Sequence, residues 1–105
     1  MDLKQILQES SAGILVTDAD FKIIWANKFE EDYYGKPLAE LQGLSVVNCH
    51  QEANRPKIKS FLEEFKTGQL KEYTKIYNGM IITYSGYYKD GEFAGLVRIR
   101  IRIPA

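Results

Sequence analysis

The chain has one cysteine and one histidine, and they are neighbours: Cys49 and His50 in the stretch VVNCHQEANRP. A thiolate and an imidazole are both metal ligands, and a nearby histidine can make a thiol reactive. A structural zinc site within one chain needs further sulfur or nitrogen ligands. Because the sequence has no second cysteine or histidine, we predict no metal site. The pair is then open to a redox role through Cys49, or to a structural role at a turn.

Composition indicates an ordinary globular domain. The chain has 105 residues, of which 45% are hydrophobic and 27% charged, with 14 basic and 14 acidic side chains that leave no net charge. No apolar run is long enough to cross a bilayer, and a single cysteine forms no internal disulfide. We therefore expect a cytoplasmic protein that binds neither membrane nor nucleic acid.

The first quarter of the chain predicts a short helix followed by a β-hairpin. Asp2 can cap a helix over residues 2–9, and strand-like runs at 13–18 and 21–27 are joined by the turn residues Asp18, Ala19 and Asp20. Asn27 with Glu30 has the spacing of a capping box, which predicts the start of a second helix. We expect Glu30 to cap that helix on an otherwise exposed acidic face.

A longer helix is predicted from Asn54 to Gly68. Its apolar residues recur with helical spacing, Pro56 occupies a first-turn position, and Gly68 provides a stop. The apolar residues are Ile58, Phe61, Leu62 and Phe65.

The last third of the chain predicts three strands. Residues 70–78, 80–88 and 92–103 are rich in β-branched and aromatic side chains, and Asn78-Gly79 and Asp90-Gly91 are strong hairpin turns. In the last strand, Ile99 and Ile101 alternate with Arg98 and Arg100. We expect the isoleucines to face the helices, and the arginines to form a solvated face or a partner surface.

This order of elements predicts an α+β fold. Strands at both ends of the chain suggest one five-stranded antiparallel sheet, with short helices and one longer helix on one face. We expect an N-terminal amphipathic helix over residues 1–10 and one domain over 11–105.

Over nearly its full length the sequence resembles a PAS domain. The segments that carry the resemblance are GILVTDADFKIIWAN, YYGKPLAELQG and YKDGEFAGLVRIRI, in this order and spacing. The resemblance implies a sensor or dimerisation module with a pocket between sheet and helices. A finer similarity joins NCHQEANRPKIKSFLEEFKTG to the PAS segment of bacterial hemerythrin-associated proteins of unknown function, although Gln51 stands where that pattern has proline.

The resemblance adds two cofactors to the roles open to Cys49 and His50. Some PAS sensors hold haem through a histidine, and either residue is a possible axial ligand. Light-oxygen-voltage domains hold flavin beside a cysteine in an Asn-Cys-Arg run, but His50 replaces the arginine here, and the last strands lack the amide side chains that would bind the flavin ring. Haem is thus the stronger of the two candidates, and the ligand's identity stays open.

We predict a small-molecule or cofactor-binding sensor that acts through homodimerisation or through an output-domain protein. The alternatives are a dimerisation scaffold whose own side chains fill its core, and an unrecognised enzyme; no catalytic constellation supports the latter. The predicted pocket is lined by Ile24, Ala26, Ile58, Phe61, Leu62, Ile82, Tyr84, Ile99 and Ile101, with Cys49 and His50 at its rim. The predicted dimer surface comprises Leu3, Ile6, Leu7, Phe21, Ile23 and Trp25.

Overall fold

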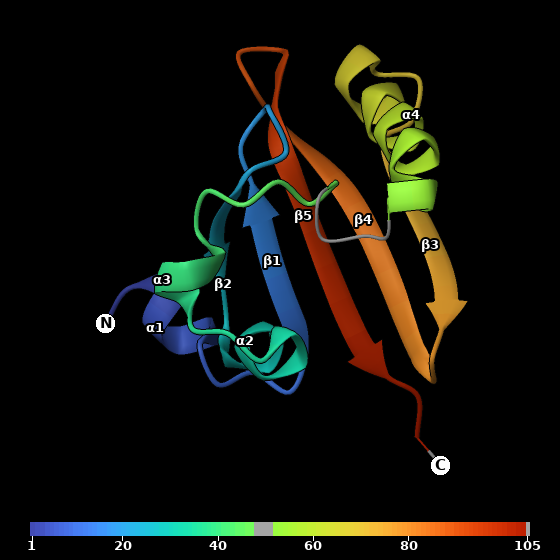
Figure 1. The fold of residues 1–105 in the computed structure, drawn as a ribbon. Helices are drawn as coiled ribbons and strands as arrows, with labels where there is room; N and C mark the ends of the chain where they lie inside the picture. Colours follow the sequence, from blue (N-terminus) through green and yellow to red (C-terminus); the bar gives the residue numbers. More distant parts are fainter. Residues whose placement is uncertain (48–51, 105) are drawn as a thin grey trace.

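The computed structural model describes residues 1–47 and 52–104, whose strands form one antiparallel sheet. The strand order is β2-β1-β5-β4-β3, so the two ends of the chain meet where β1 pairs with β5 at the centre of the sheet (Figure 1). This confirms the predicted α+β class and the five-stranded sheet. The strands are β1 (Gly13–Thr17), β2 (Ile23–Ala26), β3 (Glu72–Tyr77), β4 (Met80–Lys89) and β5 (Glu92–Arg102).

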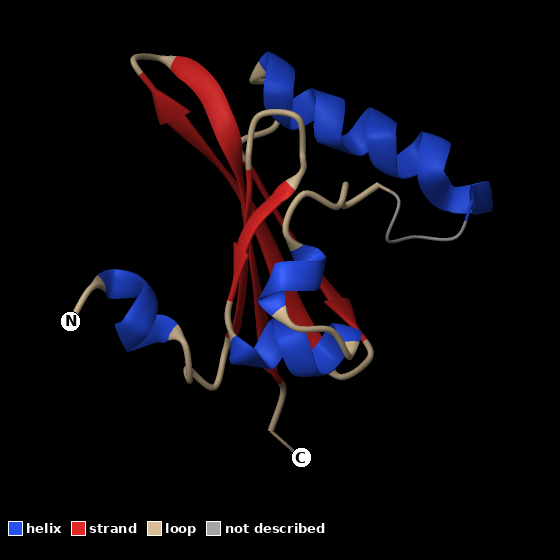
Figure 2. Ribbon diagram, turned by 60° about the vertical axis from the view of Figure 1, so that its left-hand side comes forward, coloured by secondary structure: helices blue, strands red, loops and turns tan. Residues whose placement is uncertain are grey.

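The helices divide between the two sides of the sheet. Figure 2 shows α2, α3 and α4 on one side, called the inner face below, and α1 on the other, called the outer face. None of the helices in the described part of the chain is long and apolar enough to cross a membrane. The helices are α1 (Leu3–Leu7), α2 (Lys28–Tyr34), α3 (Leu38–Leu41), the 3-10 helix η1 (Glu52–Asn54) and α4 (Arg55–Thr67).

The helix ends follow the local signals of the sequence. Asp2 and Gln5 form a reciprocal capping box at α1. The left-handed residues Gly35 and Gly68 end α2 and α4, where a residue without a Cβ meets the least strain. The turn pairs at Asn78-Gly79 and Asp90-Gly91 also have positive φ, as a tight hairpin turn between twisted strands requires.

Asn27 joins three elements by its buried side chain. Its Oδ1 accepts hydrogen bonds from the backbone N–H groups of Ile14 in β1 (3.0 Å) and Glu30 in α2 (3.4 Å). Its Nδ2 donates to the carbonyls of Leu7, at the end of α1 (3.1 Å), and Ala12 (2.8 Å). The predicted cap of α2 is therefore present at Asn27, but the expected return contact from the Glu30 side chain is not, because that carboxylate is buried elsewhere.

A bulge in β2 changes which of its residues face inward. Thr17 pairs with Ile23 while Val16 pairs with Trp25, so Ile24 has no opposite partner on β1. An extra residue reverses the alternation of side chains, and Ile23 and Ala26 therefore both point to the core. Phe21, in the preceding turn, is also buried there. The predicted placement of Ile23 on the dimer surface is wrong because of this bulge. The placement of Phe21 is also wrong, since its ring is buried from a turn in which its backbone has a positive φ.

A second bulge sets the faces of β5. Next to the turn, Lys89 pairs with Glu92 and Tyr88 with Phe93, but Tyr87 then pairs with Gly95, so Ala94 is skipped. If the pairing next to the turn continued along the strands without a bulge, Ile82 would lie opposite Ile99. Because of the bulge, Ile82 lies opposite Arg100.

The faces of β5 are consequently the reverse of those predicted. Arg98 and Arg100 lie on the inner face and are only 4% and 5% exposed, whereas Ile101 on the outer face is 50% exposed. The outer face is apolar on β1 and β5, and a row of Ile76, Ile81 and Ile101 crosses β3, β4 and β5. The other outer positions of β3 and β4 are the polar residues Glu72, Thr74, Thr83 and Ser85. The apolar residues of this face are called the outer apolar surface: Ile14, Val16, Ile76, Ile81, Val97, Ile99 and Ile101.

The hydrophobic core fills the space between one half of the inner face and the helices. Phe65 of α4, Leu41 of α3 and Leu15 of β1 are almost completely inaccessible to solvent. The core is completed by Phe21, Ile23, Ala26, Val46, Leu62 and Leu96. The other half of the inner face, over β5, β4 and β3, carries polar and aromatic side chains and is where the cavity lies.

Candidate ligand-binding cavity

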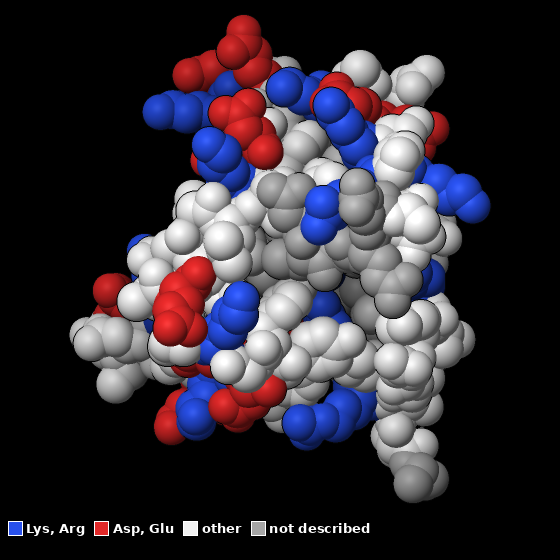
Figure 3. All heavy atoms as spheres, in the orientation of Figure 1, with Lys and Arg blue, Asp and Glu red and all other residues white. Residues whose placement is uncertain are grey.

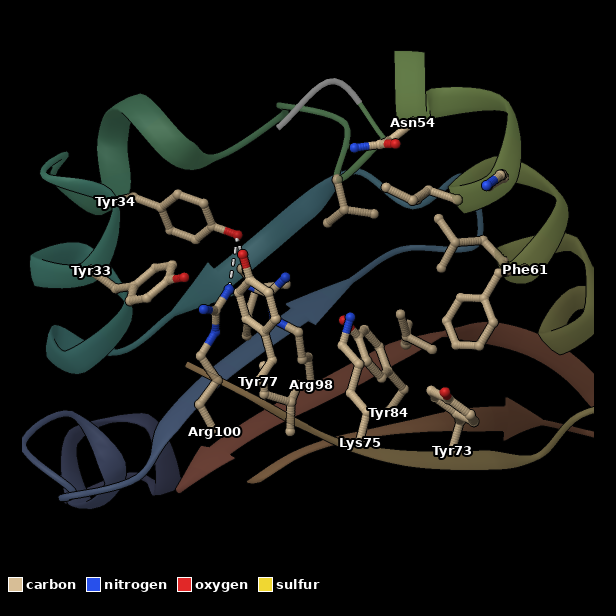
Figure 4. A pocket seen from close by; sticks show the side chains of 17 residues that line it. Tyr33, Tyr34, Asn54, Phe61, Tyr73, Lys75, Tyr77, Tyr84, Arg98 and Arg100 are labelled. Atoms are coloured by element: carbon tan, nitrogen blue, oxygen red, sulfur yellow. Dashed lines mark hydrogen bonds between the residues drawn. The ribbon is translucent and has the colours of Figure 1, made fainter. Parts of the chain in front are cut away.

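A cavity of about 620 Å³ lies between α2, α4 and the inner face of the sheet. Figure 4 shows side chains from these three sources converging on it, with Tyr33 and Tyr34 on the α2 side and Phe61 on the α4 side. Its size falls within the range of small-molecule sites. The lining residues are Leu15, Tyr33, Tyr34, Val46, Asn54, Lys57, Ile58, Phe61, Leu62, Tyr73, Lys75, Tyr77, Ile82, Tyr84, Leu96, Arg98 and Arg100.

The floor of the cavity is made of rows of side chains that run across the sheet. Arg98 on β5 pairs with Tyr84 on β4, which pairs with Tyr73 on β3. In the next row Arg100 is opposite Ile82, and Ile82 is opposite Lys75. Because paired residues project to the same side, each row presents a cation beside aromatic or apolar groups.

The two arginines meet a carboxylate from α2. Arg98 Nη2 donates to Glu30 Oε1 at 2.7 Å, and Arg100 Nε lies 3.2 Å from Glu30 Oε2, close but not aligned for a hydrogen bond. Glu30 is completely buried. Its space exists because Gly13, opposite Arg100 on β1, has no side chain: a Cβ there would lie 2.6 Å from Glu30 Oε2. The exposed capping role predicted for Glu30 is therefore wrong.

Two tyrosines of α2 complete the cationic end of the cavity. The Tyr34 hydroxyl accepts hydrogen bonds from Nη2 of Arg98 (2.7 Å) and, more weakly, from Nη2 of Arg100 (3.4 Å). The Tyr33 ring lies against the Arg100 guanidinium, with 3.8 Å between Cζ and the ring centroid, a cation-π contact. The dashed lines in Figure 4 mark the contacts at Tyr34.

The charge of Arg98 is fixed by its neighbours. Burial lowers the pKa of its guanidinium, but the effects of Tyr34 and Glu30 outweigh burial and leave the pKa above its ordinary value. The side chain is therefore a permanent cation. With one carboxylate between two guanidiniums, the cluster keeps a net positive charge.

The opposite end of the cavity is aromatic. The Phe61 ring of α4 packs edge-on against Tyr73 and Tyr84, with centroid distances of 5.1 and 5.4 Å. Lys75 Nζ lies 5.6 Å from the centroid of Tyr84 and 5.7 Å from that of Tyr77. These rings form an apolar wall of the cavity, away from the arginine cluster.

The space-filling view faces this side of the molecule. Acidic and basic side chains are mixed around the rim, and atoms of Lys or Arg are visible in the hollow at its centre (Figure 3). The basic residues that line the cavity are Lys57, Lys75, Arg98 and Arg100, and no Asp or Glu is among the described lining residues.

The structure brings some of the predicted lining residues together around the cavity. Five of the predicted residues line the cavity, from α4 and β4: Ile58, Phe61, Leu62, Ile82 and Tyr84. The helical spacing of α4 correctly identified its inward residues. Cys49 and His50, predicted at the rim, lie outside the described residues.

The other predicted lining residues are elsewhere. Ala26 is buried in the core beside the cavity, and Ile24 is 43% exposed because of the β2 bulge. Ile99 and Ile101 belong to the outer face because of the β5 register. These placements correct the sequence prediction for Ile24, Ile99 and Ile101.

Sequence reasoning missed the arginines and the α2 tyrosines. Arg98 and Arg100 occupy the inner face only because the bulge after Tyr87 moves the register by one residue. The one chemical signal in the sequence was Glu30, which lies three and four residues before Tyr33 and Tyr34 and therefore shares a helix face with them. If that face is buried, the carboxylate needs a buried cation.

Comparisons with known proteins agree with this fold. The model of the family described as "PAS fold" matches residues 7–72, more than half of the chain. No curated protein matches the sequence. The finer resemblance to the hemerythrin-associated PAS segment is not supported by these comparisons.

Solved structures with similar folds are PAS and sensor domains of distant sequence. The PAS domain of Bordetella pertussis BvgS has a TM-score of 0.75 and 15% identity, over 98% of this chain and 85% of that one. A PAS domain from Colwellia psychrerythraea has a TM-score of 0.76 and 20% identity, over 94% and 92%. A sensory box sensor histidine kinase from Vibrio cholerae has a TM-score of 0.73 and 10% identity, over 98% and 90%. The chain belongs to the PAS family, the sensor domains of signalling proteins.

Proposed function

We propose that this PAS domain is a sensor module that binds a small molecule in the cavity between α2, α4 and the inner face. The observation that carries the proposal is the 620 Å³ volume bounded by side chains from three separate elements. A ligand in this position would contact α2, α4 and the sheet at once, so its binding would alter how the helices pack on the sheet. A dimerisation scaffold with a self-filled core would have no such volume.

Haem and flavin are the two cofactors that could occupy the cavity in place of a diffusible ligand. Among the described lining residues, the groups that can ligate haem iron are tyrosine hydroxyls and lysine amines, and the predicted ligands Cys49 and His50 lie outside that part of the chain. Flavin binding needs polar partners for its ring, and Asn54 is the one amide side chain among the described lining residues. On the described lining residues alone, the proposed ligand is a colourless organic molecule.

The occupied or empty state would be passed on through a homodimer or to an output-domain protein in the cytoplasm, without catalysis by this chain. The outer face supports the dimer: a row of Ile76, Ile81 and Ile101 crosses three of its strands, and all three side chains are exposed. Leu3 and Ile6 of α1, on the same side of the sheet, are also exposed. We assign residues 1–10 to this contact and 11–105 to the sensor domain itself.

Native mass spectrometry and absorption spectroscopy of the purified protein test the proposal. We expect no Soret or flavin band. In a thermal-shift screen of small metabolites we expect at least one compound to raise the melting temperature, since ligand that binds only the folded state stabilises it. A Tyr84→Trp variant narrows the cavity from its floor, so it should fold but no longer show the ligand-induced rise in melting temperature. The control variant Tyr88→Trp, at an exposed site outside the cavity, should still show that rise. If no compound shifts the melting temperature, the scaffold alternative is correct.

A further inference from the structure

We propose that the ligand of this cavity is a small aromatic carboxylate, whose anionic group lies against Arg98 and Arg100 and whose ring lies against the tyrosines and phenylalanine at the other end. The inference rests on the proposed ligand-binding function and names the chemical class of the ligand. It comes from the charges, unpaired donors and aromatic groups of the lining residues.

The charge of the cavity calls for an anion. Four of the described lining residues are basic: Lys57, Lys75, Arg98 and Arg100. The described lining residues include no Asp or Glu. Glu30 contacts both arginines from α2 and neutralises one of the two guanidiniums. In the described part of the chain, Lys57 and Lys75 have no acidic partner within ion-pair distance. An anionic ligand would supply a counter-charge, with the largest effect at Arg98 and Arg100, where burial limits solvent screening.

The hydrogen-bonding groups at the cationic end include more donors than acceptors. Nε of Arg98 and Nε of Arg100 are buried and donate to no acceptor in the described chain. Glu30 Oε2, 3.2 Å from Arg100 Nε, is the one buried acceptor among the described residues here that receives no aligned hydrogen bond. The Tyr34 hydroxyl already accepts from both guanidiniums, and its own proton has no acceptor among the described residues. Buried donors are normally paired, so a group that only accepts hydrogen bonds completes the site. An ionised carboxylate is such a group.

The other end of the cavity fits a ring. Phe61, Tyr73 and Tyr84 are mutually packed, and Tyr84 is adjacent to Arg98 in the same cross-strand row. Figure 4 shows these rings on the opposite side of the cavity from Tyr34 and Arg100. A planar apolar body can pack edge-on or offset against such rings. A purely inorganic anion would leave this wall without contacts.

The test uses phenylacetate and indole-3-acetate as probes of the proposed class, measured by isothermal titration calorimetry with the full chain. Phenylacetamide has the same ring without the charge, and acetate and inorganic phosphate have charge without the ring. We expect at least one aromatic acid to bind, with the amide, acetate and phosphate each at least about tenfold weaker, the loss that removing a charged hydrogen bond produces.

Two pairs of variants locate the anion. Arg100→Gln keeps the Glu30–Arg98 pair, and its matched control is Arg102→Gln, two residues further along the same strand, exposed and outside the cavity. Lys75→Gln is matched by Lys71→Gln, an exposed lysine just before β3. We expect Arg100→Gln to weaken the aromatic acid at least about tenfold, Lys75→Gln to weaken it less, and both controls to leave the affinity within a factor of about two.

The outcomes separate this inference from the function on which it rests. Binding of the amide as tightly as the acid, or an unchanged affinity in both Arg100→Gln and Lys75→Gln, overturns the anionic class but leaves a ligand-binding sensor. If phosphate or acetate binds with the same affinity as the aromatic acids, the proposal that the ligand carries an aromatic ring is overturned. If no probe binds while the metabolite screen gives a hit of another class, the inference alone fails. If neither gives a hit, both fail.

Discussion

Glu30 Oε1 lies 2.7 Å from Arg98 Nη2, in a pair whose side chains are 0% and 4% exposed. The pair joins the first turn of α2 to the middle of β5, two elements separated by more than sixty residues in sequence. A buried ion pair adds little net stability compared with apolar residues of the same size, but loss of one partner leaves a buried, uncompensated charge. The contact therefore fixes where α2 sits on the sheet.

Replacing Glu30 by Gln should strongly destabilise the fold. Two buried guanidiniums would then lack a carboxylate, and we expect the free energy of unfolding to fall by about 3 kcal/mol or more. The matched variant is Asp32→Asn in the same helix, whose partner Lys28 is exposed and 3.4 Å away; it should cost less than about 0.5 kcal/mol. Urea denaturation monitored by circular dichroism measures both. Equal losses in the two variants would contradict a structural role for the buried pair.

Replacing Tyr34 by Phe should cost about 1 to 2 kcal/mol of stability. The change removes the acceptor at 2.7 Å from Arg98 Nη2 and leaves a buried cation with one acceptor fewer. Tyr33→Phe is the matched control, because the Tyr33 ring contacts Arg100 while its hydroxyl makes no hydrogen bond in the described chain. It should be within about 0.5 kcal/mol of the original protein in the same urea titration. A reversed order of the two variants would refute this interpretation of the α2 tyrosines.

Tyr87 should make stability fall at high pH. Burial, and secondarily the charge of Asp18, raises the pKa of Tyr87 above its ordinary value of 10.0, and its hydroxyl donates to the Thr17 carbonyl at 2.6 Å. The folded state then holds this proton more tightly than the unfolded state. The contribution is complete below the unfolded pKa and is lost as pH rises through the folded pKa. Between about pH 9 and 11, the free energy of unfolding should fall less in Tyr87→Phe than in the original chain. An equal fall in both proteins, measured by urea denaturation at the two pH values, would contradict the raised pKa of Tyr87.

Replacing Ile101 by Glu should disrupt the proposed homodimer. Ile101 is half exposed on the outer face beside Ile81, where a buried carboxylate without a partner would oppose association. We expect sedimentation equilibrium to give a dimer for the original chain and a monomer for the variant. Tyr88→Glu, at a similarly exposed site near the β4–β5 turn, should stay dimeric. A monomeric original chain, with Ile101→Glu unchanged, would remove the homodimer from the proposed function.

The sequence predicted well what neighbouring residues determine. Asp2 and Gly68 mark helix ends, and Asn78-Gly79 marks a turn, because caps and tight turns depend on a few adjacent residues. The helical spacing of Ile58, Phe61 and Leu62 gave the correct face of α4. These features needed no knowledge of the tertiary structure.

The faces of two strands could not be predicted in the same way. Alternation gives the side chains of a strand two faces but does not say which one the helices cover, and a bulge moves residues from one face to the other. The unpaired residues, Ile24 in β2 and Ala94 in β5, are fixed by pairing with partner strands and have no local signal. Arg98 and Arg100 were therefore placed on the wrong side, and with them the chemistry of the cavity.

Asn27 gives the cavity a mechanical link to the other side of the sheet. One buried amide holds the start of α2, which carries Glu30 and leads to Tyr34, and the end of α1 at Leu7. Gln8, just after α1, adds two contacts to α2: its carbonyl accepts from the Lys28 N–H at 2.9 Å, and its Nε2 donates to Glu31 Oε1 at 3.2 Å. Any shift of α2 relative to α1 must stretch or break these hydrogen bonds. Asn27 and Gln8 therefore couple the N-terminal helix mechanically to the cavity wall on the other side of the sheet.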